Sequence, residues 1–198
     1  MKKATIVTYG CQMNVNESEK ARTLLSEMGY EFCEKVSEAD LVMLNTCTIR
    51  EGAAKKIYGK LGELKTIRNR GKHQVVIVSG CLAQEEGEEL LHKWKHVNIV
   101  VGNQNIYLLT EAIHKIEYQG FKQILLTEDL DLLPPMIFPE HNTPTSAYVS
   151  ITYGCNNYCA YCIVPYVRGR ERSEPMENVI TQINMLLKKG VKEIILLG

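Results

Sequence analysis

The sequence lacks a net charge, because its 198 residues include 23 basic and 23 acidic side chains. This balance argues against a dedicated nucleic-acid arm, since phosphate binding is driven by clustered lysine and arginine, although a local basic patch remains compatible with it. The sequence also lacks an apolar run near the roughly 20 residues that a membrane span requires. Its start, MKKATIVTYG, has no signal-peptide pattern. We therefore expect a soluble, cytoplasmic protein of one or two domains without a membrane partner.

The cysteine content is the first positive signal. Seven cysteines, an odd number, occur in a chain without a secretory signal, which favours metal binding or catalysis over disulfides. Three of them, Cys155, Cys159 and Cys162, lie within one short stretch, and the other four are dispersed.

Hydrophobic patterning predicts an α/β fold. Short β-branched runs such as ATIVTY, DLVMLNT and QVVIVSG alternate with helical patterns, which is typical of a parallel sheet with helices on both faces. We expect the first helix to start with a capping box of Asn16 and Glu19, and the third helix to cover residues 85–95. Domain boundaries follow from composition: residues 1–126 form the first domain, and residues 127–146, with four of the six prolines, form a linker.

Residues 147–198 predict a single strand–helix–strand unit. Such a unit cannot close a barrel, which takes ~250 residues. We therefore expect the second domain to be truncated and the chain to be a piece of something longer.

Three of the dispersed cysteines, Cys11, Cys47 and Cys81, each follow a predicted strand directly. The carboxyl ends of parallel strands share one sheet edge, where such folds bind ligands, so these thiols could converge on one metal cluster. Zinc is an alternative occupant, although structural zinc sites normally use closely paired cysteine or histidine ligands, which this region lacks. The third alternative is that they are small buried hydrophobes, which is our interpretation of Cys33.

The close triplet has the spacing C-x3-C-x2-C, and the nearest histidine in sequence is the distant His141. Zinc sites and ferredoxin-like sites would use a fourth protein ligand. Three thiolates alone suit an iron–sulfur cluster with one iron open to a substrate or cosubstrate; the alternative is a structural loop with incidental thiols.

With its aromatic Tyr161, the triplet resembles the signature of the radical S-adenosylmethionine superfamily. That resemblance implies a 4Fe–4S cluster on Cys155, Cys159 and Cys162, with S-adenosylmethionine bound at its open iron and beside Tyr161. The protein would position a cofactor that supplies the radical chemistry.

Together with TYGCQMNVNESE, NTCTIREGAAKKIYGKLGEL and VSGCLAQ, the triplet region resembles the methylthiotransferases along nearly the whole chain. The resemblance implies a flavodoxin-like domain whose Cys11, Cys47 and Cys81 hold a second, auxiliary 4Fe–4S cluster. It also implies that the second domain begins a radical S-adenosylmethionine partial (β/α) barrel.

The segments GCQMN and NTCTIRE resemble the MiaB-type branch of that family. This implies a tRNA methylthiotransferase that inserts sulfur and a methyl group at carbon 2 of N6-isopentenyladenosine beside the anticodon. Its partners would be tRNA, recognised at a single-stranded loop, and an electron donor for cluster reduction. The alternatives are another branch of the family, acting on threonylcarbamoyladenosine tRNA or a ribosomal protein, and a non-enzymatic protein with two iron–sulfur clusters.

Polar residues near the cysteines are further candidates. Gln12, Asn14 and Asn45 could orient the cluster cysteines or serve as turn and cap residues.

A run of arginines follows the triplet in VRGRERS. Arg168, Arg170 and Arg172 could contact phosphate or substrate, or form a solvated run that pairs with Glu171 and Glu174. Family members carry more barrel and an RNA-binding domain, so we expect these 198 residues alone not to complete turnover. Their oligomeric state stays open.

Overall fold

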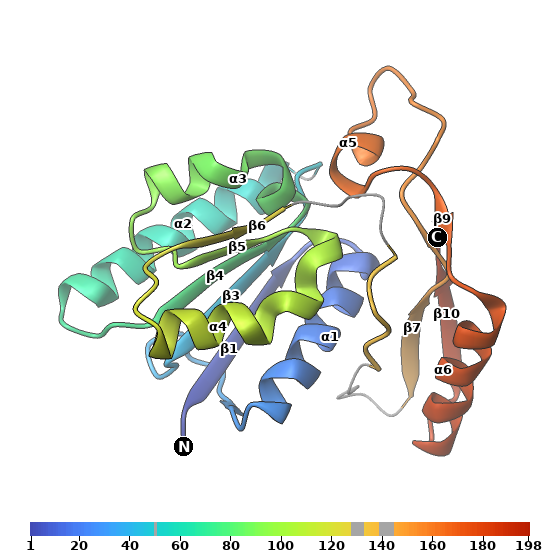
Figure 1. Cartoon of the computed structure of the whole chain (residues 1–198), viewed down its shortest axis with the longest axis horizontal. Coiled ribbons are helices and arrows are strands. Elements are labelled where there is room, and N and C mark those ends of the chain that lie inside the picture. The colour runs from blue at the N-terminus through green and yellow to red at the C-terminus, as the bar shows by residue number, and fades with distance from the viewer. Residues whose placement is uncertain (50, 128–132, 139–144) are drawn as a thin grey trace.

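The computed structural model describes residues 1–49, 51–127, 133–138 and 145–198 (Figure 1). Its main feature is a six-stranded parallel sheet in the order β2-β1-β3-β4-β5-β6. The strands are β1 (Lys3–Tyr9), β2 (Glu31–Phe32), β3 (Leu41–Thr46), β4 (Val75–Gly80), β5 (Ile99–Val101) and β6 (Ile124–Leu126). This order is the flavodoxin-like order with one added strand, so the predicted α/β class is confirmed.

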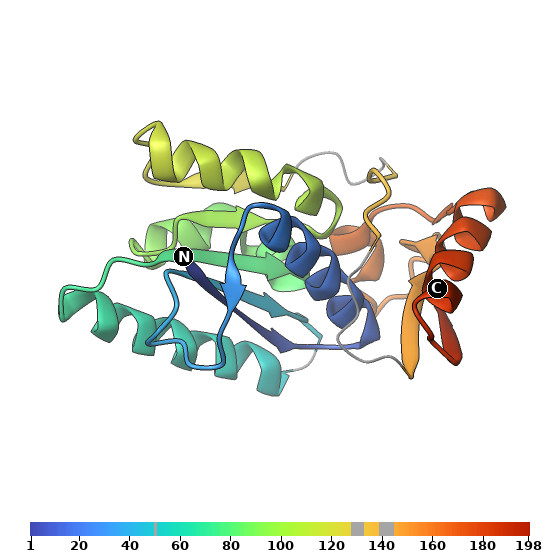
Figure 2. The ribbon, with the colours of Figure 1, turned by 90° about the horizontal axis from the view of Figure 1, so that it is seen from below.

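Helices cover both faces of this sheet, and Figure 2 shows α2 and α4 on opposite sides of it. One face carries α2 (Glu51–Asn69) and α3 (Cys81–Lys93). The other face carries α1 (Gln12–Glu27), the 3-10 helix η1 (Asn103–Leu108) and α4 (Leu109–Tyr118).

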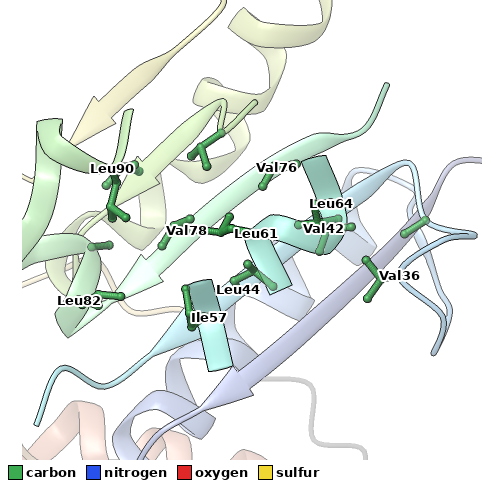
Figure 3. Close-up of a cluster of buried hydrophobic side chains, with 14 residues drawn as sticks. Val36, Val42, Leu44, Ile57, Leu61, Leu64, Val76, Val78, Leu82 and Leu90 are labelled. Carbon is green, nitrogen blue, oxygen red and sulfur yellow. The ribbon is translucent and has the colours of Figure 1, made fainter. Parts of the chain in front are cut away.

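Each face has its own hydrophobic core. Beneath α2, the side chains of Ile57 and Leu61 pack with Leu44 of β3 and are fully buried (Figure 3). Burying each such side chain stabilises the fold by about 1.5–3 kcal/mol. The strands are apolar on both faces because both faces are covered.

Residues 146–198, here called the carboxy-terminal unit, form a smaller structure. Strands β7 (Ser146–Ser150) and β10 (Glu193–Leu197) pair in parallel, joined through α6 (Met176–Lys188). Its buried core consists of Ala147, Val149, Leu186 and Val191. The predicted strand–helix–strand unit is confirmed.

Short elements that the sequence patterns did not predict complete this unit. A two-residue antiparallel pair joins β8 (Thr152–Tyr153) to β9 (Arg172–Ser173), and α5 (Val164–Arg168) lies between them in sequence. These elements and β6 are too short to show hydrophobic periodicity.

Helix α1 lies between the six-stranded sheet and the carboxy-terminal unit (Figure 1 and Figure 2). Asn16 Nδ2 donates to Tyr148 O (2.9 Å), and Ser150 Oγ donates to Asn16 Oδ1 (3.2 Å). The predicted capping role of Asn16 is therefore wrong, because this side chain lies inside the helix and joins it to β7.

Two predicted helix starts are too late. Helix α1 begins at Gln12 because Asn14 Oδ1 accepts a hydrogen bond from the Cys11 N–H, which caps the helix at Cys11 in place of the predicted Asn16. Helix α3 begins directly at Cys81, because Gly80 turns the chain with φ +91°. Both cysteines thus lie at helix starts.

Candidate metal centre

Register brings the three dispersed cysteines to one edge of the sheet. Tyr9 of β1 is aligned with Thr46 of β3, which is aligned with Gly80 of β4. Because each cysteine follows one of these aligned residues by one or two positions, all three emerge at the same level.

This edge opens into a cavity of about 510 Å³ that both cysteine sets line. Its cysteine lining is Cys11, Cys47, Cys81, Cys155 and Cys162. The structure therefore places cysteines from the six-stranded sheet opposite cysteines from the carboxy-terminal unit.

A buried amide network holds Cys11 in place. Asn14 Oδ1 accepts from the Cys11 backbone N–H (3.2 Å) and its thiol (3.4 Å). Asn14 Nδ2 in turn donates to Asn45 Oδ1 (2.9 Å), and Asn45 Nδ2 donates to Asn14 O (2.9 Å) and Ser18 Oγ (3.0 Å). Asn14 and Asn45 thus orient Cys11, whereas Gln12 is exposed and has no side-chain hydrogen bond within the described ranges.

Cys81 is the most enclosed of the thiols, with 3% of its surface exposed. Burial raises its pKa, and the nearby Arg168 guanidinium opposes that rise. Asn103 Nδ2 points at its sulfur from η1 at 3.6 Å.

Arg168 lies inside the protein, not on a solvated surface run. Its Nη1 donates to Glu17 Oε1 at 3.0 Å, which joins α5 to α1. Burial alone would lower the pKa of Arg168, but Glu17, Cys81 and Cys11 raise it above its ordinary value. Its Nη2 is buried without a hydrogen-bond partner among the described residues. The alternative interpretation of Arg168, a solvated residue paired with Glu171 and Glu174, is therefore wrong.

The triplet loop is organised by its own backbone. The Cys162 N–H donates to Cys159 O (2.9 Å), and the Cys155 N–H donates to Gly169 O (3.2 Å). Gly154, with φ +75°, is approached so closely by the Arg170 carbonyl that a side chain would not fit. Cys159 is exposed, unlike the dispersed set.

Two other predicted residues are not among the described residues that line the cavity, although Tyr161 lines a neighbouring hollow with Cys162. Tyr161 is 93% exposed and Arg170 is exposed as well. Their predicted roles toward S-adenosylmethionine and substrate stay predictions.

The donor set fits a group larger than one ion. Within the described ranges, no three histidine, cysteine, aspartate or glutamate side chains could together hold a single metal ion. A single zinc ion would need its thiolates about 3.8 Å from one another, because each is bonded at about 2.3 Å in a tetrahedron. The absence of a single-ion group among the described residues does not fit that arrangement. A wide cavity lined with thiols, beside the unpartnered Arg168 Nη2, suits a larger anionic group with sulfur ligands.

Sequence reasoning missed three polar residues around the cavity. Glu17 pairs with Arg168, Asn103 approaches Cys81, and Gln104 Nε2 donates to Arg168 O (3.3 Å). No short motif marks them, because their role depends on a contact between distant segments.

Fold and site together define a class: a flavodoxin-like α/β unit joined to a strand–helix–strand unit, with two cysteine sets around one cavity. Residues 3–102 match the model described as "Uncharacterized protein family UPF0004", and residues 149–198 match that of the radical SAM superfamily. The chain belongs to the UPF0004 family.

Two bacterial relatives that carry the same name as each other are similar to this chain in sequence. The "tRNA-2-methylthio-N(6)-dimethylallyladenosine synthase" of Fusobacterium nucleatum is 52% identical over 198 residues, covering all of this chain and 45% of that protein. The protein of the same name from Dictyoglomus thermophilum is 42% identical over 200 residues, again across 45% of its length. The chain thus spans less than half the length of these curated relatives, and the sequence-based recognition of the family is confirmed.

Among solved structures, the radical S-adenosylmethionine methyltransferase TsrM from Kitasatospora setae is similar in fold, with a TM-score of 0.58 and 11% identity. The match covers 97% of this chain and 48% of that one. At this identity the likeness concerns the fold alone. Among the described residues, no helix is long and apolar enough to cross a membrane.

Proposed function

We propose that this chain carries the cluster-binding part of a tRNA methylthiotransferase that uses radical S-adenosylmethionine chemistry. The observation that carries the proposal is the cavity lined by all three dispersed cysteines and by Cys155 and Cys162 of the close set. The names of the Fusobacterium and Dictyoglomus relatives support tRNA carrying N6-dimethylallyladenosine as the substrate and sulfur and methyl insertion as the reaction. Such a substrate would place the protein in the cytoplasm.

In this proposal, residues 1–126 form the auxiliary-cluster domain, residues 127–146 the linker and residues 147–198 the start of the radical domain. Two 4Fe–4S clusters would be held, one by Cys11, Cys47 and Cys81, the other by Cys155, Cys159 and Cys162. When bound, the second cluster would supply reductive cleavage of S-adenosylmethionine, with electrons from a separate donor, and the first would supply the sulfur.

The protein's own residues prepare the cavity for that chemistry. Arg168 places a positive charge beside Cys81, which opposes the rise that burial causes in the pKa of that thiol, while its pairing with Glu17 keeps the guanidinium fixed. Val164 and Val167 add apolar side chains to the lining of the cavity.

Iron and sulfide counts after anaerobic reconstitution test the site. We expect about eight irons per wild-type chain, as two four-iron clusters require. Replacing either cysteine set by alanine should leave about four, and replacing Cys33, the cysteine outside both sets, should change nothing. A single cluster in the wild type, or zinc in place of iron, would overturn the assignment.

S-adenosylmethionine separates the proposal from a non-enzymatic two-cluster protein. We expect it to change the electron paramagnetic resonance spectrum of the reduced chain, and to lose this effect when the close cysteine set is replaced. An unchanged spectrum would favour the non-enzymatic alternative. That these 198 residues alone do not methylthiolate prenylated tRNA stays a prediction, tested by product analysis with S-adenosylmethionine and reductant.

A further inference from the structure

A second cavity, of about 310 Å³, lies at the opposite edge of the sheet from the cysteines. It is formed where α2 ends and where the chain turns after α3 toward β5. We call it the basic pocket, and its lining is Lys65, Arg68, Asn69, Lys93, Trp94, Lys95 and His96. Four of these residues are cationic, and no aspartate or glutamate of the described ranges lines the pocket.

Three of the four cations of the basic pocket have no acidic partner in the part of the chain that the structure describes. Among the described residues, Lys65, Arg68 and Lys95 form no ion pair, whereas Lys60, earlier in α2, and Lys115 of α4 each pair with a glutamate. Mutual repulsion of these charges favours an anion in the hollow between them.

Buried His96 reports the same positive potential. Its Nε2 lies 2.9 Å from Leu61 O, which fixes the ring next to the end of α2. Burial lowers its pKa, and the charges of Arg68 and Lys65 lower it further.

Trp94 also lines the basic pocket. Its ring stacks on Tyr58 with centroids 6.5 Å apart and meets His96 edge-on at 5.7 Å. Its Nε1 is buried and lacks a hydrogen-bond partner among the described residues. The indole N–H can only donate, so cations and a donor without an acceptor occur together, which is the complement of a phosphate oxygen.

Helix α2 links this pocket to the cysteine cavity. The helix starts two residues after Ile49, which lines that cavity, and ends at the basic pocket. Its 19 residues extend for about 28 Å. Its sequence has five lysines and arginines against two glutamates, and Lys60 is paired with Glu63, so the helix between the two sites has a net positive charge.

We propose that the basic pocket binds a backbone phosphate of RNA whose remaining chain runs along α2 to the cysteine cavity. The choice of RNA rests on the proposed function, whereas the phosphate chemistry rests on the pocket alone. The competing explanation is that these cations only offset the carboxyl-end dipoles of α2 and α3. That explanation predicts a loss of stability on substitution without a loss of RNA binding.

Trp94 is the sole tryptophan of the chain, so its fluorescence reports on the pocket directly. The experiment titrates the 198-residue chain, kept reduced, with an anticodon stem-loop RNA at several salt concentrations. Trp94 fluorescence reports the pocket, and the anisotropy of labelled RNA reports total binding. We expect both signals to saturate together, with an affinity that falls as salt rises.

Two double variants with the same loss of charge test the location. In Arg68→Ala/Lys95→Ala, we expect the slope of log affinity against log salt to shrink by about 1 to 2, because one or two phosphate contacts are lost. In the control Lys188→Ala/Lys189→Ala, at the exposed end of α6, the slope should stay unchanged. Urea unfolding confirms that both variants fold.

Three results would overturn the proposal. Equal weakening in both double variants would mean that net charge alone matters. RNA binding without a change in Trp94 fluorescence would place RNA elsewhere and leave the proposed function intact, which the iron counts test separately. Inorganic phosphate that saturates the Trp94 signal and is not displaced by RNA would identify a free-phosphate site instead.

Discussion

The two cysteine sets reach one cavity by opposite routes. Cys11, Cys47 and Cys81 are each separated by more than 30 residues and are brought together by the register of three strands. The close set comes from one loop of the carboxy-terminal unit, and its Cys159 is exposed. The first set therefore depends on the packing of a large sheet, whereas the second depends mainly on local spacing. Substitutions should separate them.

The largest effect on stability is expected at the ion pair that joins α5 of the carboxy-terminal unit to α1 beside the six-stranded sheet. Arg168→Met leaves the Glu17 carboxylate buried without its partner, which should lower the free energy of unfolding by about 3–5 kcal/mol. Urea unfolding measures this change. Arg170→Met, an exposed neighbour of equal charge, should cost at most about 1 kcal/mol.

The double variant Glu17→Gln/Arg168→Met should recover part of that loss, because no buried charge remains. Equal costs for Arg168→Met and Arg170→Met would show that the ion pair does not join the two regions.

Gly80→Ala should damage the dispersed set alone. At φ +91° an added Cβ would meet Thr46 O and Asn45 Oδ1, so we expect a loss of about 2–4 kcal/mol and about half of the bound iron. Gly190→Ala is the matched control, since φ is +88° there with nothing within 4 Å. It should cost only the backbone strain, about 1–2 kcal/mol, and no iron. A full iron count in Gly80→Ala would contradict the dependence on strand register.

Asn45→Ala and Asn157→Ala compare the amide near the dispersed set with the amide near the close set. Asn45→Ala leaves Asn14 without a buried partner, which should cost about 1–3 kcal/mol and speed the alkylation of Cys11. Asn157→Ala removes an exposed amide that lies 3.4 Å from Cys155 Sγ and should change stability by less than about 0.5 kcal/mol. Mass spectrometry after timed iodoacetamide labelling gives both rates. Unchanged labelling of Cys11 would argue against its orientation by this network.

The smallest effect is a pH dependence confined to the six-stranded sheet. Burial lowers the pKa of His96, so below about pH 6.5 the unfolded chain binds a proton that the folded chain does not. Stability is then lost as the pH falls from about 6.5 toward the lowered pKa. Residues 146–198 contain no histidine and should lack this dependence.

Urea unfolding of the wild type and of His96→Gln at about pH 7.5 and pH 5.5 measures this pH dependence. The glutamine amide can still donate to Leu61 O, so the variant keeps the hydrogen bond without the titrating group. The variant should lose less stability than the wild type between the two pH values. The same loss in both proteins would assign the pH dependence to other groups.

The alternation of strands and helices was predictable because burial on both faces produces continuous apolar runs such as Val75–Gly80. The positions of the cysteines after predicted strands and the close spacing of the triplet were equally visible. Strand β6 and helix α5 were not, because elements of three and five residues show no periodicity.

The sequence by itself determined the parallel α/β class and which cysteines form the dispersed set and the close set. Only the tertiary structure decided that β1, β3 and β4 are neighbours in register, that Asn16 joins α1 to β7, and that Arg168 points inward to Glu17. The physical reason is that hydrophobic periodicity reports which face of an element is buried, whereas register and the docking of distant segments depend on long-range packing. A charged residue such as Arg168 is buried only where a partner from another segment meets it.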